Sequence, residues 1–376
     1  MKLRHSLAKL GLTLDNQTAT LALLLATSSH SVVRRLVAAA GNPVEALDLL
    51  SSDLLPATLD AHKLSALVNK ELKQCARAGV SIILPTSPLW LPQLSGACRP
   101  PAVVFVRGLW PPPNAPRIAM VGSRKATDYG RRMARTLATE LGEAGATIVS
   151  GGASGIDAAC HEAALHAAAP TIAVLGSSLV HPYPSANRKL FEEITHSGAL
   201  LSEYPSVLPV APYRFPERNR LLVAISQATV VVQCPVASGA MHTARFAIQA
   251  SQPLFAVPGP ADDCANAGSN ALLDMGARPA SPGRVASIMA PGKRLASPLL
   301  NQKLPQPAEI DLSILDPLPR KVLSALAEGV CHMDDLGTML NASPAALSEA
   351  LLHCELNGWI QREAGNRYGL RINVTG

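Results

Sequence analysis

Apolar residues recur at helical spacing over about the first 80 of the 376 residues. The segments 17–29, 30–41 and 59–79 place Leu, Val and Ala three or four positions apart, which predicts amphipathic helices. Gly41 is expected to end one helix, and the Asn-Pro-Val-Glu sequence of 42–45 has the cap, the first-turn proline and the acidic third position that begin another. We therefore predict a small helical domain over 1–80.

The pattern changes near residue 101 to short runs rich in Val and Ile, most of them separated by amphipathic segments. These runs lie at 101–108, 117–123, 146–152, 171–178, 199–204, 228–235 and 253–259. Continuous apolar strands that alternate with helices indicate a parallel sheet covered on both faces. We predict a doubly wound, mostly parallel α/β domain over 81–278, with its ligand site at the carboxyl ends of the strands.

Two further parts follow. Residues 279–310 contain six prolines and predict a linker. Over 311–376, three helical segments precede two short strands around a turn at Gly365-Asn366, which is the element order of a winged-helix domain.

Composition and charge exclude more than they identify. The chain is 48% hydrophobic and 16% charged, as in ordinary globular proteins. The net charge of +6 weakly favours a polyanionic partner, but 1–116 holds 11 basic and 6 acidic residues whereas 117–278 holds 13 and 12. The charge surplus therefore lies outside the part in which the predicted ligand site falls.

Other features narrow the class of protein. The seven cysteines are scattered without a C-x-x-C pair, which argues against a zinc cluster or a disulfide framework and for the reducing cytoplasm. The Leu-rich run at 21–25 follows basic residues as in a signal peptide, but polar residues at 15–17 interrupt it. No unbroken apolar stretch of about 18 residues occurs, so we expect no membrane span.

Three predicted strands end in Gly/Ser-rich segments. They comprise Gly122, Ser123, Arg124 and Lys125; Ser150, Gly151, Gly152 and Gly155; and Ser238 and Gly239, followed by Thr243. Small residues between a strand and a helix let backbone N–H groups approach an anion, so together these segments favour a phosphate-binding surface. The alternative for the 150–155 loop is a tight turn that only packs closely. Neither G-x-G-x-x-G nor a P-loop occurs, so dinucleotide binding and P-loop hydrolysis lose support.

A cluster of basic residues lies at 214–220, where a helix is expected to begin. It comprises Arg214, Phe215, Arg218, Asn219 and Arg220. Arginine pairs bidentately with phosphate and a Phe ring can stack on an unpaired base, which favours a single-stranded nucleic acid. The alternative is a helix start whose arginines pair with neighbouring carboxylates. No G-x-S-x-G, H-E-x-x-H or acidic two-metal cluster follows a strand, so no catalytic residue, metal or cofactor is predicted.

Motifs in a fixed order resemble the DNA-processing protein A (DprA/Smf) family of bacterial natural transformation. They are VGSRKATDYG at 121–130, SGGASGID at 150–157, YPSAN at 183–187, SEYP at 202–205, FPERNR at 215–220, SGAMHTAR at 238–245, and VPG at 257–259 followed by GSNALLDMGA at 268–277. The resemblance implies an extended Rossmann-like domain with a SAM-like helical domain before it. It also implies a homodimer that binds and protects single-stranded DNA without cleaving it and loads the RecA recombinase.

The resemblance also assigns roles to residues. Arg124 would contact phosphate, Phe215 a base, and Arg218 and Arg220 phosphate or the pocket's architecture. The 150–155 loop would donate backbone N–H groups, and Asn187 belongs to the YPSAN motif.

Two residues would act on the pocket's structure instead. Asp157 and Asn219 would hold the loop and the helix start in place.

Several positions depart from the family's pattern. Ser154 replaces a frequent arginine, Val180 replaces an Asp, Pro212 stands where a lysine is common, and Gln233 replaces a Glu. These departures leave the predicted fold intact but put the affinity for DNA in doubt.

Two rival functions remain. A phosphoribohydrolase of the LOG type would share a similar Rossmann variant, but its PGGxGT-x-x-E signature ends in a Glu, whereas Thr243 is followed by Ala-Arg-Phe. A transcription factor would read DNA with the helix at 343–358, which contains no Lys or Arg. We therefore expect the winged helix to contact protein or to stabilise the assembly.

Overall fold

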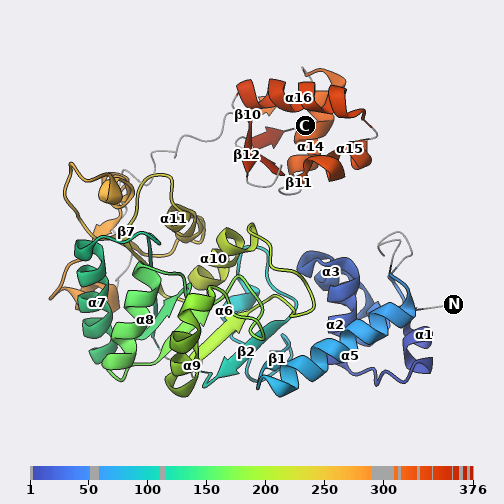
Figure 1. Ribbon diagram of the computed structural model, residues 1–376, viewed down its shortest axis with the longest axis horizontal. Coiled ribbons are helices and arrows are strands. Elements are labelled where there is room, and N and C mark those ends of the chain that lie inside the picture. The colour runs from blue at the N-terminus through green and yellow to red at the C-terminus, as the bar shows by residue number, and fades with distance from the viewer. Residues whose placement is uncertain are drawn as a thin grey trace. The chain divides into compact units, whose positions relative to one another are not determined.

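A computed structural model describes residues 3–50, 59–110, 116–289, 309–311, 315–327, 331–340, 342–357, 359–363, 367–370 and 373–375. The predicted turn at 365–366 and most of the predicted linker lie outside these residues. The chain divides into two compact units, Met1–Ala296 and Ser297–Gly376 (Figure 1). Within the described ranges, no helix is long and apolar enough to cross a membrane.

The first unit begins with helices, as the apolar spacing predicts. They are α1 (Leu3–Lys9), α2 (Asn16–Thr27), α3 (His30–Ala40), α4 (Pro43–Ala46) and α5 (Ala61–Arg77). Gly41 caps α3 with a φ of 87°, and the Asn42 side chain accepts a hydrogen bond from the Glu45 N–H at the start of α4.

The helical bundle shares its hydrophobic core with the sheet that follows. Its buried residues lie in one cluster with Val103 and Phe105 of the sheet region and with Phe191 of a later helix. The bundle therefore packs directly on the α/β part of the chain.

The sheet has nine strands in the order β1-β2-β6-β5-β4-β3-β7-β8-β9. They are β1 (Ser81–Ile83), β2 (Val104–Gly108), β3 (Arg117–Gly122), β4 (Thr147–Ser150), β5 (Thr171–Val174), β6 (Ala199–Ser202), β7 (Ala228–Gln233), β8 (Leu254–Ala256) and β9 (Arg278–Pro279). All neighbours from β6 to β9 pair in parallel, whereas β2 runs antiparallel to both of its neighbours, β6 and the edge strand β1. The predicted doubly wound, mostly parallel sheet is confirmed.

Helices cover both faces of the sheet. They are α6 (Pro92–Ser95), α7 (Asp128–Glu143), α8 (Ile156–His166), α9 (Arg188–Ser197), α10 (Arg214–Ala224), α11 (Gly239–Gln249), α12 (Ala267–Asp274) and α13 (Val285–Met289). Ile118 and Met120 of β3 lie in one core cluster with α7 and α8, whereas Val121 lies in a second with α10 and α11. Alternate strand residues thus feed two cores, as the apolar runs predict.

Two details differ from the predicted boundaries. The three-residue edge strand β1 was not predicted, because its apolar stretch at 80–84 is short. At the other end, β9 and α13 extend the first unit beyond residue 278, because Ala280 and Ile288 are buried in its core. Pro279 is compatible with β9 because this strand lies at the sheet edge.

The second unit has the elements of a winged helix. Helices α14 (Pro317–Ala327), α15 (Met333–Leu340) and α16 (Pro344–Leu356) surround a core that includes Leu323, Leu336 and Leu351. The antiparallel strands β12 (Ile360–Glu363) and β13 (Arg367–Leu370) pair beside β11 (Cys331–His332). A short parallel pair joins β10 (Glu309–Asp311) to β14 (Asn373–Thr375).

The buried ring of His161 in α8 makes the stability of the fold depend on pH. The Nδ1 atom of His161 lies 2.7 Å from the hydroxyl of Thr171, which itself donates to the carbonyl of Ile148. His161 therefore donates from Nδ1 as a neutral ring. Burial lowers its pKa to about 3.

We expect the free energy of unfolding to decrease as the pH falls from about 6.5 towards 3. In this range His161 is protonated in the unfolded chain but stays neutral in the folded protein. One such proton contributes about 1.4 kcal/mol per pH unit. The His161→Asn variant keeps an amide donor near Thr171 and should show a shallower acid limb in denaturant titrations. Superimposable acid limbs would contradict the prediction.

Candidate nucleic-acid interface

The loops after β3, β4 and β7 border one cavity of about 610 Å³. It lies where the crossovers from β3 and β7 diverge to opposite sides, the usual ligand position in a doubly wound sheet. Among the predicted site residues, those that line it are Gly122, Ser123, Arg124, Lys125, Phe215, Arg218, Asn219, Ser238, Gly239 and Thr243. The fold thus brings together residues that lie up to about 120 positions apart in the chain.

The β3 loop presents two exposed cations at this cavity. Ser123 donates its backbone N–H to the carbonyl of Gln233 at 2.7 Å and accepts one from Ile156 at 3.1 Å, so the loop is fixed to β7 and to the start of α8. The side chains of Arg124 and Lys125 project from this fixed backbone and are exposed. They are placed to meet an anion from solvent.

The β4 loop is held close to α10, and its glycines permit that packing. A Cβ atom on Gly151 would lie 2.6 Å from both Arg218 Nη2 and Asp157 Oδ2, and one on Gly155 would meet the Ser123 carbonyl at 2.3 Å. Gly152 and Gly155 also have φ values of 68° and 84°. Ser150 is fully buried, and its hydroxyl donates to a β3 carbonyl.

Some backbone N–H groups of this loop already donate hydrogen bonds within the protein. The Ala153 N–H donates to Asp157 Oδ2 at 3.3 Å, and the Ile156 N–H donates to the Ser123 carbonyl. The close-packing role of the loop is therefore visible in the structure, whereas phosphate binding by its remaining N–H groups stays a prediction.

Arg218 and Asp157 form the buried base of the cavity. Arg218 donates from Nη1 to the Gly151 carbonyl at 2.7 Å and from Nε to Asn219 Oδ1 at 3.1 Å. Burial lowers the pKa of Arg218 to about 10 and raises that of Asp157, with each side chain's charge opposing the shift of the other. Arg218 is only 5% exposed, and both of these contacts tie it to the protein.

Phe215 lies between a cation and a second aromatic ring. The Arg124 guanidinium carbon is 5.7 Å from its ring centroid, and the Tyr183 ring centroid is 5.5 Å away at an interplanar angle of 56°. A Cβ on Gly176 would lie 2.8 Å from a Phe215 ring atom, so this glycine makes room for the ring. Tyr183 was not among the predicted site residues; its ring is 51% exposed and lies against Phe215, which only the structure shows.

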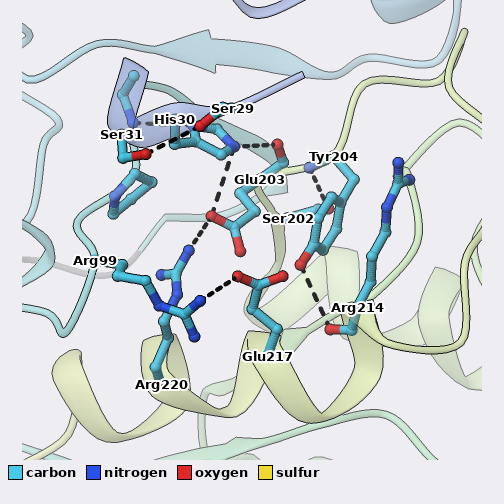
Figure 2. Close-up of polar contacts among 12 residues, drawn as sticks. Ser29, His30, Ser31, Arg99, Ser202, Glu203, Tyr204, Arg214, Glu217 and Arg220 are labelled. Atoms are coloured by element: carbon cyan, nitrogen blue, oxygen red, sulfur yellow. Dashed lines mark hydrogen bonds and ion pairs between the residues drawn. The ribbon is translucent and has the colours of Figure 1, made fainter. Parts of the chain in front are cut away.

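The other two arginines of the 214–220 cluster do not line the cavity. Arg220 is 3% exposed and forms an ion pair with the buried carboxylate of Glu203 (Figure 2). Arg214 is 7% exposed, and its guanidinium carbon lies 4.7 Å from the Tyr204 ring centroid. For Arg220 the alternative of pairing with a neighbouring carboxylate is the arrangement observed.

The start of α11 forms the opposite wall. Ser238 caps this helix by accepting from the Ala240 N–H, and Asn219 donates from Nδ2 to the Gly239 carbonyl at 3.2 Å. The Thr243 hydroxyl is buried and has no hydrogen-bond partner among the described residues.

Asn187 is the one predicted site residue of the YPSAN motif. It lies outside the cavity and donates to the Gly152 carbonyl at 2.9 Å.

The departures from the family's pattern have distinct positions. Gln233 is fully buried and donates to Thr127 Oγ1 at 2.8 Å and to Asn266 Oδ1 at 3.0 Å, so its amide has a structural role. Ser154 and Pro212 are exposed, where they remove possible cations from the surface.

Two family models match this chain and show which family it belongs to. The family model described as DNA recombination-mediator protein A matches residues 81–289, and one described as the DprA winged helix domain matches 305–366. The chain belongs to the DNA recombination-mediator protein A family. The matched parts span the cavity and the winged helix, whereas most of the N-terminal helical bundle precedes them.

Relatives of this family include both DprA and Smf proteins. The chain is 33% identical over 280 residues to Protein Smf of Synechocystis, covering 68% of this chain and 70% of that one. It is 31% identical over 287 residues to Protein Smf of Escherichia coli, covering 76% of each. The solved structure of DNA processing protein A from Streptococcus pneumoniae matches with a TM-score of 0.56 at 26% identity, over 76% of this chain and 96% of that one.

The buried base of the cavity gives a stability prediction for this family member. In Asp157→Asn a neutral amide replaces the carboxylate beside Arg218, which leaves a buried guanidinium without its opposite charge. We expect the free energy of unfolding at pH 8 to fall by about 3 kcal/mol in urea titration. The control Asp262→Asn alters an exposed turn residue and should stay within about 0.5 kcal/mol of the parent. Equal losses in both variants would contradict the structural role of Asp157.

Proposed function

We propose that this chain binds single-stranded DNA in the cavity after β3, β4 and β7 without cleaving it. The observation that carries the proposal is the placement of two exposed cations, Arg124 and Lys125, at the cavity that Phe215 lines, with Arg124 next to the Phe215 ring and Tyr183 against its other side. Cations that track a phosphate backbone next to rings on which bases stack are the usual means of binding single strands. Membership of a recombination-mediator family supports DNA as the polyanion.

Each group in the cavity has a separate task. Arg124 and Lys125 neutralise phosphates, and the starts of α8 and α11 present the positive ends of their helix dipoles to the same cavity. Phe215 and Tyr183 take unstacked bases, which a duplex does not offer. Single strands should therefore bind more tightly than duplex.

The wider role rests on the family resemblance. We propose that the protein acts in the cytoplasm as a homodimer that protects incoming single strands during natural transformation. It would then load RecA onto them for homologous recombination.

We propose that the winged helix contacts protein or stabilises the assembly. Helix α16 contains Glu349 and Glu355 and no Lys or Arg, so its charge opposes insertion into a groove lined by phosphates.

A phosphoribohydrolase of the LOG type is the alternative function. The α11 sequence GAMHTARFAIQ contains no acidic residue that could attack or position a sugar. We expect incubation with nucleoside monophosphates to release no free base, as measured by chromatography. Release at enzyme-like rates would overturn the binding-protein proposal.

Two substitutions separate phosphate from base contacts. Arg124→Ala should weaken binding of an oligo-dT strand in a fluorescence-anisotropy titration and reduce the slope of log K against log salt by about one. Phe215→Ala should weaken binding by roughly 5- to 150-fold, the equivalent of about 1–3 kcal/mol of stacking, with the slope retained.

Arg77→Ala is the matched control because it removes an exposed arginine at the end of α5, outside the cavity. Unchanged affinity in both Arg124→Ala and Phe215→Ala would remove the proposed site.

A further inference from the structure

The segment between β6 and α10, residues 203–213, leads into the helix that carries Phe215 and Arg218. Two side chains of the N-terminal helical bundle contact this segment: Glu71, which is buried, and His30, which is partly buried. Most of that bundle lies outside the part of the chain matched by the family models.

Glu71 of α5 binds the backbone of the segment directly. Its carboxylate is 1% exposed and accepts hydrogen bonds from the N–H groups of Ser206 at 2.9 Å and Val207 at 3.0 Å. The Ser206 hydroxyl donates to the same carboxylate at 2.7 Å, and the thiol of Cys75 at 3.3 Å. A buried carboxylate is costly unless such donors satisfy it, so the chain folds 206–207 around this group.

His30 at the start of α3 holds the beginning of the segment. Its Nδ1 accepts from the Ala102 N–H at 3.0 Å, which leaves the ring proton on Nε2. Nε2 lies 3.1 Å from the Glu203 carbonyl and so donates to it (Figure 2). The Glu203 carboxylate then pairs with Arg220 on α10.

A last contact links the segment to the first turn of α10. The Tyr204 hydroxyl donates to the Arg214 carbonyl at 3.5 Å, and the Arg214 guanidinium covers the Tyr204 ring. Arg214 is the residue before Phe215. The path from Glu71 to the ring of Phe215 therefore runs through Ser206, Tyr204 and Arg214, over a few covalent bonds and the contacts described above.

We propose that Glu71, supported by His30, is a positioning residue for the DNA site. The helical bundle fixes segment 203–213 and through it the placement of Phe215 over the cavity. This inference rests on the proposed function, since its readout is the binding of single-stranded DNA.

The test is a double-mutant cycle on the full chain, with oligo-dT binding followed by fluorescence anisotropy. Glu71→Ala should weaken binding roughly tenfold when Phe215 is present and less than about twofold in the Phe215→Ala background, because residues that act through each other are not additive. The salt slope should stay the same in Glu71→Ala, since the phosphate contacts of Arg124 remain. Glu143→Ala removes an exposed carboxylate at the end of α7 and should leave binding unchanged in both backgrounds.

Milder variants keep the test decisive if Glu71→Ala does not fold. Glu71→Gln retains one acceptor oxygen and should restore part of the affinity, and Ser206→Ala should weaken binding by a smaller factor that also disappears in the Phe215→Ala background.

The outcomes separate the two proposals. If Phe215→Ala binds as the parent does, the site is wrong and the positioning role fails with it. If Phe215→Ala weakens binding but folded Glu71 and Ser206 variants bind normally, or weaken binding equally in both backgrounds, only the positioning role is overturned.

Discussion

Three consecutive polar residues of α10 are buried, and each must find its partner on a different part of the fold. Arg218 bonds the β4 loop, Asn219 bonds the start of α11, and Arg220 pairs with Glu203 at the end of β6. A buried guanidinium without such partners would cost about 3–5 kcal/mol, so the fold requires the attachments of Arg218 and Arg220. The three contacts hold the segments that follow β4, β6 and β7 close to the same helix, α10.

The exposed chemistry of the cavity follows from this arrangement. Arg218 and Arg220 are bonded within the protein, whereas Arg124 and Lys125 are exposed at the rim of the cavity and Phe215 lies beside Arg124. The rim sits on backbone that the buried contacts hold in place, so a ligand meets a site that is already assembled. The N-terminal helices add to the same arrangement through carboxylate and imidazole contacts behind α10.

Sequence patterns predicted most of the fold because the sheet is buried on both faces. The seven apolar runs between 101 and 259 all became strands, β2 to β8. The two strands that were not predicted lie at the sheet edges, where burial is partial. β1 has only three residues, and β9 includes Pro279 at the start of a proline-rich stretch. Tyr183 was missed because an aromatic residue in a loop is exposed or buried according to its neighbours.

By itself, the sequence determined the order of strands and helices, the Gly/Ser-rich strand ends and the family motifs, because these depend on local spacing and residue type. Only the tertiary structure decided which members of the 214–220 cluster face outward. In a helix, residues 218, 219 and 220 point in directions about 100° apart, and the partner in each direction comes from a distant segment. A motif therefore names the residues, and packing decides which of them remain available to a ligand.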